Sequence, residues 1–117
     1  MKRINRVRKH QEFDAIIREA HYLKSPHFVV YFHSKDDKLT RIGISVSTRN
    51  GNAVKRNLIK RQIRAMIAHG YKMDNQYDLI IIVRTSYDPD NYGENESELM
   101  TSLRKIGESN IETKHKN

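Results

Sequence analysis

The chain has 117 residues, enough for one domain with a modest hydrophobic core, and its formal net charge of +8 favours nucleic acid, an anionic membrane surface or an acidic protein as partner. It has no cysteine, which excludes disulfides and cysteine-based zinc sites and is compatible with a reducing cytoplasm. Its longest apolar run, residues 79–83, is far too short to cross a bilayer, and no apolar segment of a secretory signal follows the basic N-terminus.

The N-terminal part combines a basic arm with a helix. Segment 1–9 carries five cations and no acid. We expect a flexible arm, which is either a frayed, solvated terminus or a segment that contacts phosphate when a partner binds. A helix is predicted over residues 11–20, because apolar side chains recur there at helical spacing, namely Phe13, Ile16, Ile17 and Ala20. Ser25-Pro26 then interrupts the chain, since a residue before proline avoids the helical conformation.

Two strands are predicted next, over residues 27–33 and 39–47, and the polar turn 34–38 should join them as a hairpin. In the first strand, side chains alternate between two faces: Phe28, Val30 and Phe32 on one, Val29 and Tyr31 on the other. One face of the second strand holds only small residues, namely Gly43, Ser45 and Ser47. Small side chains let either a packed helix or a ligand approach the backbone, and both alternatives stay open.

The most informative stretch is a predicted helix over residues 53–69, which holds five cations in the ten residues 55–64. Asn52 is a suitable N-cap, Gly51 can form the preceding turn, and Gly70 is a natural stop. At about 100° per residue, an apolar stripe adjoins a basic arc of roughly 140° on this helix. The stripe consists of Ile59, Ile63, Met66 and Ile67, and the arc of Arg56, Asn57, Lys60, Arg61 and Arg64.

The basic arc has two interpretations. Basic helices are often only solvated surface, but such helices usually mix opposite charges in i,i+4 pairs. Here no acid occurs at any of the 36 positions from 38 to 73. The planar fork of arginine suits phosphate, and Asn57 can hydrogen-bond a phosphate or a base edge. The pattern therefore favours an external partner that supplies negative charge.

The C-terminal part should contain one strand and one helix. The continuous apolar run 79–83 within a strand over residues 77–84 indicates burial on both faces of a sheet. Five acids in segment 88–98 suit a turn and the positive end of a helix dipole. The last helix should run over residues 96–106, with Leu99, Leu103 and Ile106 on its apolar stripe. Segment 108–117 is polar, and we expect it to be disordered.

These elements predict an α+β fold in α-β-β-β-α-β-α order, in which the third strand could also be part of a long hairpin. Helices should cover one face of a central mixed sheet in a two-layer sandwich. Residues 10–107 should form a single domain, because no repeat or linker divides them.

Catalytic constellations are scarce. No Gly-rich phosphate loop of the Walker or dinucleotide type occurs, and the six histidines show no metal-binding spacing. A metal-dependent nuclease needs converging carboxylates that hold ions about 4 Å apart, whereas the acids here are isolated or confined to 88–98. A nuclease built on a histidine pair stays open, because any two histidines could meet in space. We therefore predict binding, with no catalytic and no metal-ligating residue.

Two adjacent segments carry a family resemblance. The strand Arg41-Ile42-Gly43-Ile44-Ser45-Val46-Ser47 is followed, after a fixed gap, by Gly51-Asn52-Ala53-Val54-Lys55-Arg56-Asn57-Leu58-Ile59-Lys60-Arg61-Gln62-Ile63-Arg64. This pattern resembles the signature of the bacterial ribonuclease P protein component, and looser matches extend it over about residues 6–106. That family is the small subunit of a ribozyme that removes the 5′ leader from precursor tRNA, so the resemblance implies an endoribonuclease holoenzyme and a single RNA-binding domain.

The resemblance also implies two sets of site residues. Residues facing the RNA subunit would be Arg49, Lys55, Arg56, Asn57, Lys60, Arg61 and Arg64. A cleft between the first helix and the sheet would take the single-stranded leader, lined by Phe13, Ile17, Phe28, Tyr31, Ser45, Ser47 and Arg84. From the residues alone, Phe13, Phe28 and Tyr31 are more often core side chains than ligand platforms, although Tyr31 and the small-residue face could line one trough.

Further expectations come from the resemblance alone. The RNA subunit would carry out the cleavage and hold Mg²⁺, one protein would bind one RNA and precursor tRNA, and the complex would be cytoplasmic without a membrane partner. The fold would be that of the second domain of ribosomal protein S5. It would include a left-handed crossover through the basic helix, whereas the general rule predicts a right-handed one.

The chain departs from the family pattern at four places. Thr48-Arg49 stands where two lysines are usual, and Ala65 replaces an acid. Ile17 replaces an aromatic on the first helix, which weakens stacking. Lys24-Ser25-Pro26 replaces an Ala-Asn-Arg segment, so polar contacts expected there could be missing.

Two rival functions share the basic helix. A structural ribosomal-type RNA-binding protein would sediment with ribosomal subunits. A DNA-binding regulator would read a groove with residues 53–69, but we see no second short helix placed before it as a helix-turn-helix needs.

Overall fold

The computed structural model describes residues 10–34, 40–71 and 77–116, and the predicted basic arm 1–9 lies outside these ranges. The described elements confirm the predicted α-β-β-β-α-β-α order. In chain order they are α1 (His10–Glu19), β1 (His21–Lys24), β2 (Phe28–Ser34), β3 (Arg41–Val46), the 3-10 turn η2 (Thr48–Asn50), α2 (Ala53–Gly70), β4 (Tyr77–Val83), the 3-10 turn η3 (Pro89–Asn91) and α3 (Tyr92–Lys116).

The four strands form one mixed sheet in the order β1-β2-β4-β3. β1 pairs antiparallel with β2, β2 antiparallel with β4, and β3 parallel with β4. The predicted hairpin between the strands now seen as β2 and β3 is therefore wrong. The reason is β4, whose continuous apolar run needs cover on both faces and takes the central position between them.

The actual hairpin joins β1 to β2, and its turn is closed by the Ser25 amide donating to the Phe28 carbonyl at 2.8 Å. Sequence reasoning left β1 unplaced. β1 is four residues long and mostly exposed, so it shows neither the length nor the apolar alternation by which a strand is recognised.

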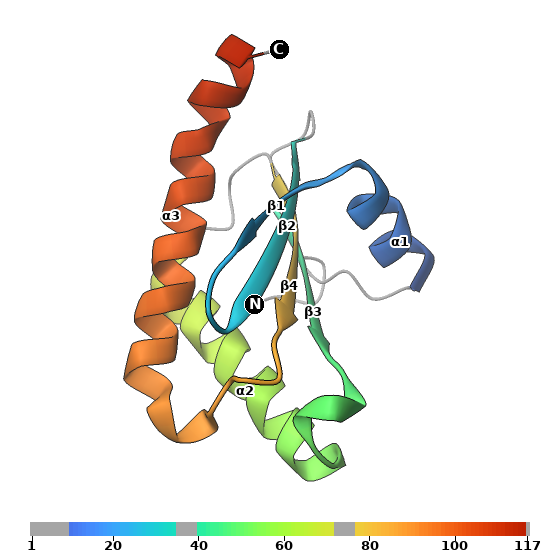
Figure 1. Cartoon of the computed structure of the whole chain (residues 1–117), viewed down its shortest axis with the longest axis vertical. Helices are drawn as coiled ribbons and strands as arrows, with labels where there is room; N and C mark the ends of the chain where they lie inside the picture. The colour runs from blue at the N-terminus through green and yellow to red at the C-terminus, as the bar shows by residue number, and fades with distance from the viewer. Residues whose placement is uncertain (1–9, 35–39, 72–76, 117) are drawn as a thin grey trace.

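Helices cover both faces of this sheet, so the prediction that they cover only one face is wrong for α1. Figure 1 shows α1 on one side of the strands and α2 and α3 on the other. On the α2–α3 side, the predicted stripe Ile59, Ile63, Met66 and Ile67 is fully buried. On the α1 side, Ile16 packs with Ile80 in a smaller core. Burial of β4 on both faces is thereby confirmed.

The start of α2 follows the predicted signals. Gly51 has φ of 130°, a conformation that favours glycine, and the Asn52 side chain accepts the Lys55 amide N–H at 2.9 Å. The helix then runs to Gly70 and connects the parallel neighbours β3 and β4. This is the βαβ unit for which the resemblance implies a left-handed crossover, and that handedness stays a prediction.

The last helix is longer than predicted. α3 begins at Tyr92 and continues to Lys116, well past the sheet (Figure 1), and Leu99, Leu103 and Ile106 are buried as expected. The segment predicted to be disordered, 108–117, is thus helical up to Lys116. Gly107 does not stop the helix, because a single interior glycine costs only about 1 kcal/mol and no proline follows it.

Candidate nucleic-acid interface

The cations of α2 lie beside its buried stripe, as the helical spacing predicts. We call Arg56, Asn57, Lys60, Arg61 and Arg64 the basic face. Asn57 and Arg61 are exposed, and Arg56, Lys60 and Arg64 are half-buried along its edge. The nearest element before α2 is the three-residue turn η2, so the described chain has no helix-turn-helix arrangement here.

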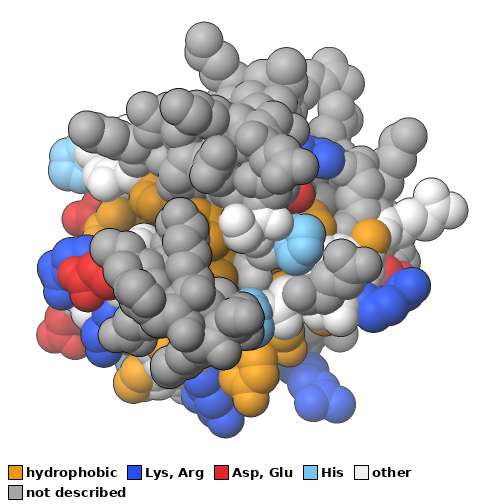
Figure 2. Space-filling view, turned by 90° about the horizontal axis from the view of Figure 1, so that it is seen from above, with side chains coloured by type: hydrophobic (Ala, Val, Ile, Leu, Met, Phe, Trp, Pro, Cys, Tyr) orange, Lys and Arg blue, Asp and Glu red, His pale blue; other side chains and the backbone are white. Residues whose placement is uncertain are grey.

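Three of the cations on α2 have no carboxylate partner within the described chain. α2 contains no acid, and no carboxylate of the described ranges pairs with Lys55, Lys60 or Arg61. One guanidinium is oriented by the backbone, since Arg56 Nε donates to the Gly51 carbonyl at 3.1 Å. The basic face is therefore suited to an external anion, for which arginine and lysine supply several donors. Figure 2, seen from above, shows Lys and Arg side chains at several points of the rim with hydrophobic side chains exposed between them.

A buried amide links the start of α2 to the end of β4. Asn50 is only 4% exposed, and its Nδ2 donates to the Arg84 carbonyl at 3.0 Å while its Oδ1 accepts from Ser47 Oγ at 3.4 Å. The exposed Arg49 of η2 is thereby held beside the end of β4. Sequence reasoning missed Asn50, because a polar residue in a loop gives no sign of burial.

On the α1 side of the sheet, the strand register aligns two rows of side chains. Tyr31, Ile80 and Gly43 lie opposite one another across β2, β4 and β3. α1 packs on this first row. The next row consists of Val29, Ile82 and Ser45, and all three are only half-buried. We call Tyr31 together with this second row the α1-side strip.

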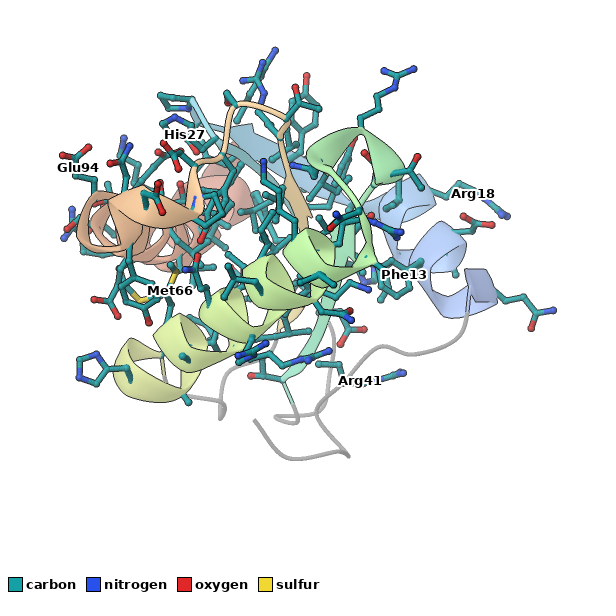
Figure 3. All side chains as sticks on the ribbon, turned by 90° about the horizontal axis from the view of Figure 1, so that it is seen from below. Phe13, Arg18, His27, Arg41, Met66 and Glu94 are labelled. Atoms are coloured by element: carbon teal, nitrogen blue, oxygen red, sulfur yellow. The ribbon has the colours of Figure 1, made fainter. Side chains whose placement is uncertain are left out.

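Gly43 shows what the small face of β3 accommodates. A Cβ at this position would lie 2.6 Å from Phe13 Cζ, so the ring of Phe13 packs directly on the glycine backbone. Figure 3 shows Phe13 pointing from α1 toward the sheet. The packed-helix alternative is therefore confirmed at Gly43. Farther along, Ser45 of β3 is half-buried and Ser47, just after the strand, is exposed, so both stay accessible.

One predicted leader-binding residue lies on the wrong side. Phe28 is fully buried on the α2–α3 face, where its ring packs edge-on against Tyr87 at 5.6 Å between centroids. Side chains alternate along a strand, so Phe28 and Tyr31, three positions apart, cannot share a face. The assignment of Phe28 to the leader site is therefore wrong. Phe13, Ile17 and Tyr31 do lie together on the α1 side.

The β1–β2 turn is fastened to α3 by a single carboxylate. Glu98 accepts hydrogen bonds from Ser25 Oγ at 2.6 Å, the His27 amide at 2.7 Å and His27 Nδ1 at 2.5 Å. This turn in turn binds Arg84. The Arg84 amide donates to the His27 carbonyl at 2.9 Å, and the Arg84 guanidinium donates to the Ser25 carbonyl at 3.0 Å. Ser25, part of the departing Lys24-Ser25-Pro26 segment, thus makes polar contacts of its own.

Neither a membrane span nor a metal site emerges from the described ranges. None of their helices is both long and apolar enough to cross a membrane. They also bring together no group of three or more His, Cys, Asp or Glu side chains that could hold a metal ion. A cavity of about 400 Å³ lies away from the α1-side strip, between the β1–β2 turn and α3.

A basic helix that contains no acid lies on one face of the sheet and a half-buried, largely apolar strip lies on the other, features that suit a small basic α+β protein to a polyanion. Comparison with known proteins makes this specific: a model of the ribonuclease P family matches residues 1–107. The chain belongs to the ribonuclease P protein family. It is 39% identical to the ribonuclease P protein component of Mesoplasma florum, over 85% of this chain and 92% of that protein. The corresponding protein of Streptococcus agalactiae is 36% identical over 92% and 98%.

Solved structures of the same family share the fold. A mutant of the Staphylococcus aureus RNase P protein superposes with a TM-score of 0.79, at 31% identity over 88% of each chain. The RNase P protein of Thermotoga maritima gives a TM-score of 0.74, at 25% identity over 86% of this chain and 96% of its own. The predicted α+β fold class is therefore confirmed.

The Glu98 contacts predict a pH-dependent stability. Burial by itself raises the pKa of Glu98, but the hydrogen bonds from Ser25 and His27 outweigh it and hold the pKa below the ordinary value of 4.5. A carboxylate with a depressed pKa stabilises the fold above that value and loses this contribution as the pH falls through the folded-state pKa. Glu98→Gln should therefore lower the free energy of unfolding by about 1–3 kcal/mol at neutral pH.

Chemical denaturation at neutral and acidic pH measures this effect. The difference between Glu98→Gln and the unmodified chain should shrink below pH 4.5. Glu108→Gln is the matched control, because Glu108 is exposed on the same helix, away from its N-terminal turn, and should change stability by less than about 0.5 kcal/mol. A constant difference across the pH range would contradict a role for the ionised carboxylate.

Proposed function

We propose that this chain is the ribonuclease P subunit that helps a catalytic RNA to remove the 5′ leader from precursor tRNA. The observation that carries the proposal is the basic face of α2, since this helix contains no acid and no carboxylate of the described ranges pairs with its Lys60 or Arg61. Family membership supplies the identity of the polyanion, because the relatives are named as ribonuclease P protein components.

The RNA subunit would bind along α2 and the turn before it. Exposed Arg61 and Asn57 would contact phosphate most directly, with half-buried cations extending the contact along the helix edge. The full set would be Arg49, Lys55, Arg56, Asn57, Lys60, Arg61 and Arg64. Such contacts release counterions, so affinity should fall steeply with salt, by a slope approaching one for each phosphate neutralised.

The single-stranded leader would lie on the α1-side strip. A strip of apolar and aromatic side chains accepts bases by stacking, whereas the duplex part of tRNA has no unstacked base to offer. Arg84, held at the end of β4 by the β1–β2 turn, would contact leader phosphate with guanidinium donors left after its bond to Ser25. Phe13, Ile17, Ser45 and Ser47 would border the leader, and Phe28 is not part of this set.

The chemistry would belong to the RNA. Phosphodiester cleavage with Mg²⁺ needs oxygen ligands grouped around the ion, and the described residues offer no such group of side chains. Mg²⁺ would therefore be held mainly by the RNA subunit, with one protein per RNA, in the cytoplasm. The protein would contribute substrate discrimination and charge neutralisation.

Reconstitution tests the proposal as a whole. The purified protein alone should cleave nothing, and addition of the cognate RNA subunit at limiting Mg²⁺ should restore 5′ processing of precursor tRNA. Cleavage at full rate by the protein after nuclease treatment would contradict the proposal, because the catalyst would then be protein. Co-sedimentation with ribosomal subunits instead of processing would favour the ribosomal alternative.

Arg61→Ala tests the basic face. Arg61 is exposed, so folding should be retained, while binding to the RNA subunit should weaken by about 1–3 kcal/mol with a salt slope reduced by about one. A filter-binding series over salt concentration measures both quantities. Arg104→Ala removes an exposed arginine from α3 and should change neither. Equal effects of the two variants would show a nonspecific loss of charge.

Tyr31→Ala tests the leader site. Loss of one stacking ring should weaken precursor tRNA binding to the holoenzyme by about 1–3 kcal/mol and leave mature tRNA unaffected. Tyr31→Phe keeps the ring and should behave like the unmodified chain. Thermal unfolding checks that the alanine variant is folded, since Tyr31 is half-buried. Equal losses for precursor and mature tRNA would refute the leader assignment.

A further inference from the structure

Tyr22 is an exposed aromatic at the edge of the sheet that the fold does not use. It lies on β1 with 61% of its surface exposed, and it is paired in register with Tyr31 of β2. The two rings are 5.6 Å apart between centroids and tilted by 47°. An aromatic ring in the core buries most of its large surface, so packing alone does not account for Tyr22.

The register places Tyr22 on the α1 side of the sheet. Directly paired residues in antiparallel strands point to the same face, so Tyr22 shares the face of Tyr31, which packs in the α1-side core. Its chain neighbours confirm this alternation. Leu23 packs toward the main core, and the ring of His21 lies 5.9 Å from that of Phe32, which belongs to the same core. Tyr22 therefore extends the α1-side strip to the free edge of the sheet.

The helix α1 offers little free aromatic surface on this face of the sheet, so the aromatic surface there comes from the strands. Its one aromatic within the described side chains, Phe13, has its ring tip packed on Gly43, and Ile17 is aliphatic. The rings available for stacking beside the half-buried Val29 and Ile82 are thus Tyr31 and Tyr22. Of these two, Tyr22 is the more exposed.

We propose that Tyr22 is a second stacking platform for the leader and takes an unpaired nucleotide farther from the cleavage site than the one at Tyr31. This inference rests on the proposed function of the α1-side strip. In the proposed function the catalytic RNA binds α2 and η2, which directly follow the edge strand β3, so a leader that starts there crosses β3, β4 and β2 before it reaches β1. Neighbouring strands are about 4.8 Å apart. Contact with Tyr22 therefore requires a longer leader than contact with Tyr31.

A leader-length series with the reconstituted holoenzyme tests the proposal. Precursor tRNAs whose leaders are shortened one nucleotide at a time are bound to holoenzyme that contains the unmodified protein, Tyr22→Ala, Tyr22→Phe or His21→Ala. Tyr22→Ala should weaken binding of long-leader precursor about tenfold, which corresponds to ~1.4 kcal/mol. The loss should disappear below a certain leader length and for mature tRNA. Tyr22→Phe should stay within about twofold of the unmodified protein, because the stacking ring is kept.

His21→Ala is the matched control, since His21 is exposed on the same strand but faces the opposite side. Its binding should not depend on leader length. A Tyr22→Ala loss that is equal for all leaders, or that His21→Ala reproduces, would overturn the proposal. Retention of full long-leader affinity by Tyr22→Ala would overturn it as well.

The same series, with Tyr31→Ala measured alongside, separates this inference from the proposed function. If the unmodified holoenzyme fails to prefer precursor over mature tRNA, the proposed leader site itself fails. If the preference is present and Tyr31→Ala reduces it while Tyr22→Ala does not, only the role of Tyr22 fails. A concentration-dependent dimer that Tyr22→Ala abolishes would instead show that the ring packs against a second copy of the chain at the sheet edge, and would overturn the proposal.

Discussion

The burial of β4 on both faces is the constraint on which the rest of this structure depends. Its apolar run cannot lie at an edge or on a wet face without exposing isoleucines, so it occupies the centre of the sheet and needs cover on two sides. α2 and α3 cover one side, and α1 covers the other. Because α1 is only ten residues long, it leaves part of its face half-exposed, and that remainder is the α1-side strip.

A chain of hydrogen bonds connects the two candidate RNA surfaces at one end of the sheet. Asn50, just before α2, bonds to the backbone of Arg84; Arg84 bonds to the turn at Ser25 and His27; and Glu98 holds that turn against α3. The start of the basic helix and the end of the strip are therefore fixed relative to each other. Such rigidity suits the proposed function, in which the subunit holds an RNA catalyst and a substrate strand in one arrangement, since a mobile junction would lose binding energy to ordering.

The sequence predicted α2 well because every signal for it is local. Asn52, Gly51 and the isoleucine spacing act within a few residues, and the structure reproduces each of them. Which strands pair with one another is harder to predict from the sequence, because strand pairing joins residues far apart along the chain. A polar turn between two strands is compatible with a hairpin, and only competition with β4 for the central position excludes it. Asn50 and Glu98 were missed for the same reason, since their partners lie 34 and 71 to 73 positions away.

The error at Phe28 has a different origin, because the information was present in the strand itself. Alternation already places Phe28 and Tyr31 on opposite faces, and the family resemblance assigned both to one site. Position in a motif therefore does not replace the geometry of the strand that carries it. Tyr22 shows the converse, since no motif singled it out and the strand register places it beside Tyr31.

The distribution of charge along the chain favours the proposed binding of RNA, because the acids of segment 88–98 lie outside the basic helix. Two of the carboxylates in segment 88–98 are engaged with histidines, Glu98 with His27 and Glu96 with His69, and Asp88 caps the turn before α3. His27 of the β1–β2 turn, His69 at the end of α2 and the start of α3 thus hold these acids, while the sequence of α2 itself contains no acid. If acids stood on α2 in i,i+4 pairs, each would stabilise the helix by only a few tenths of a kcal/mol and would cancel charge that phosphate could meet. Without such acids, α2 lacks that small gain in stability, and its positive electrostatic potential can attract a polyanion.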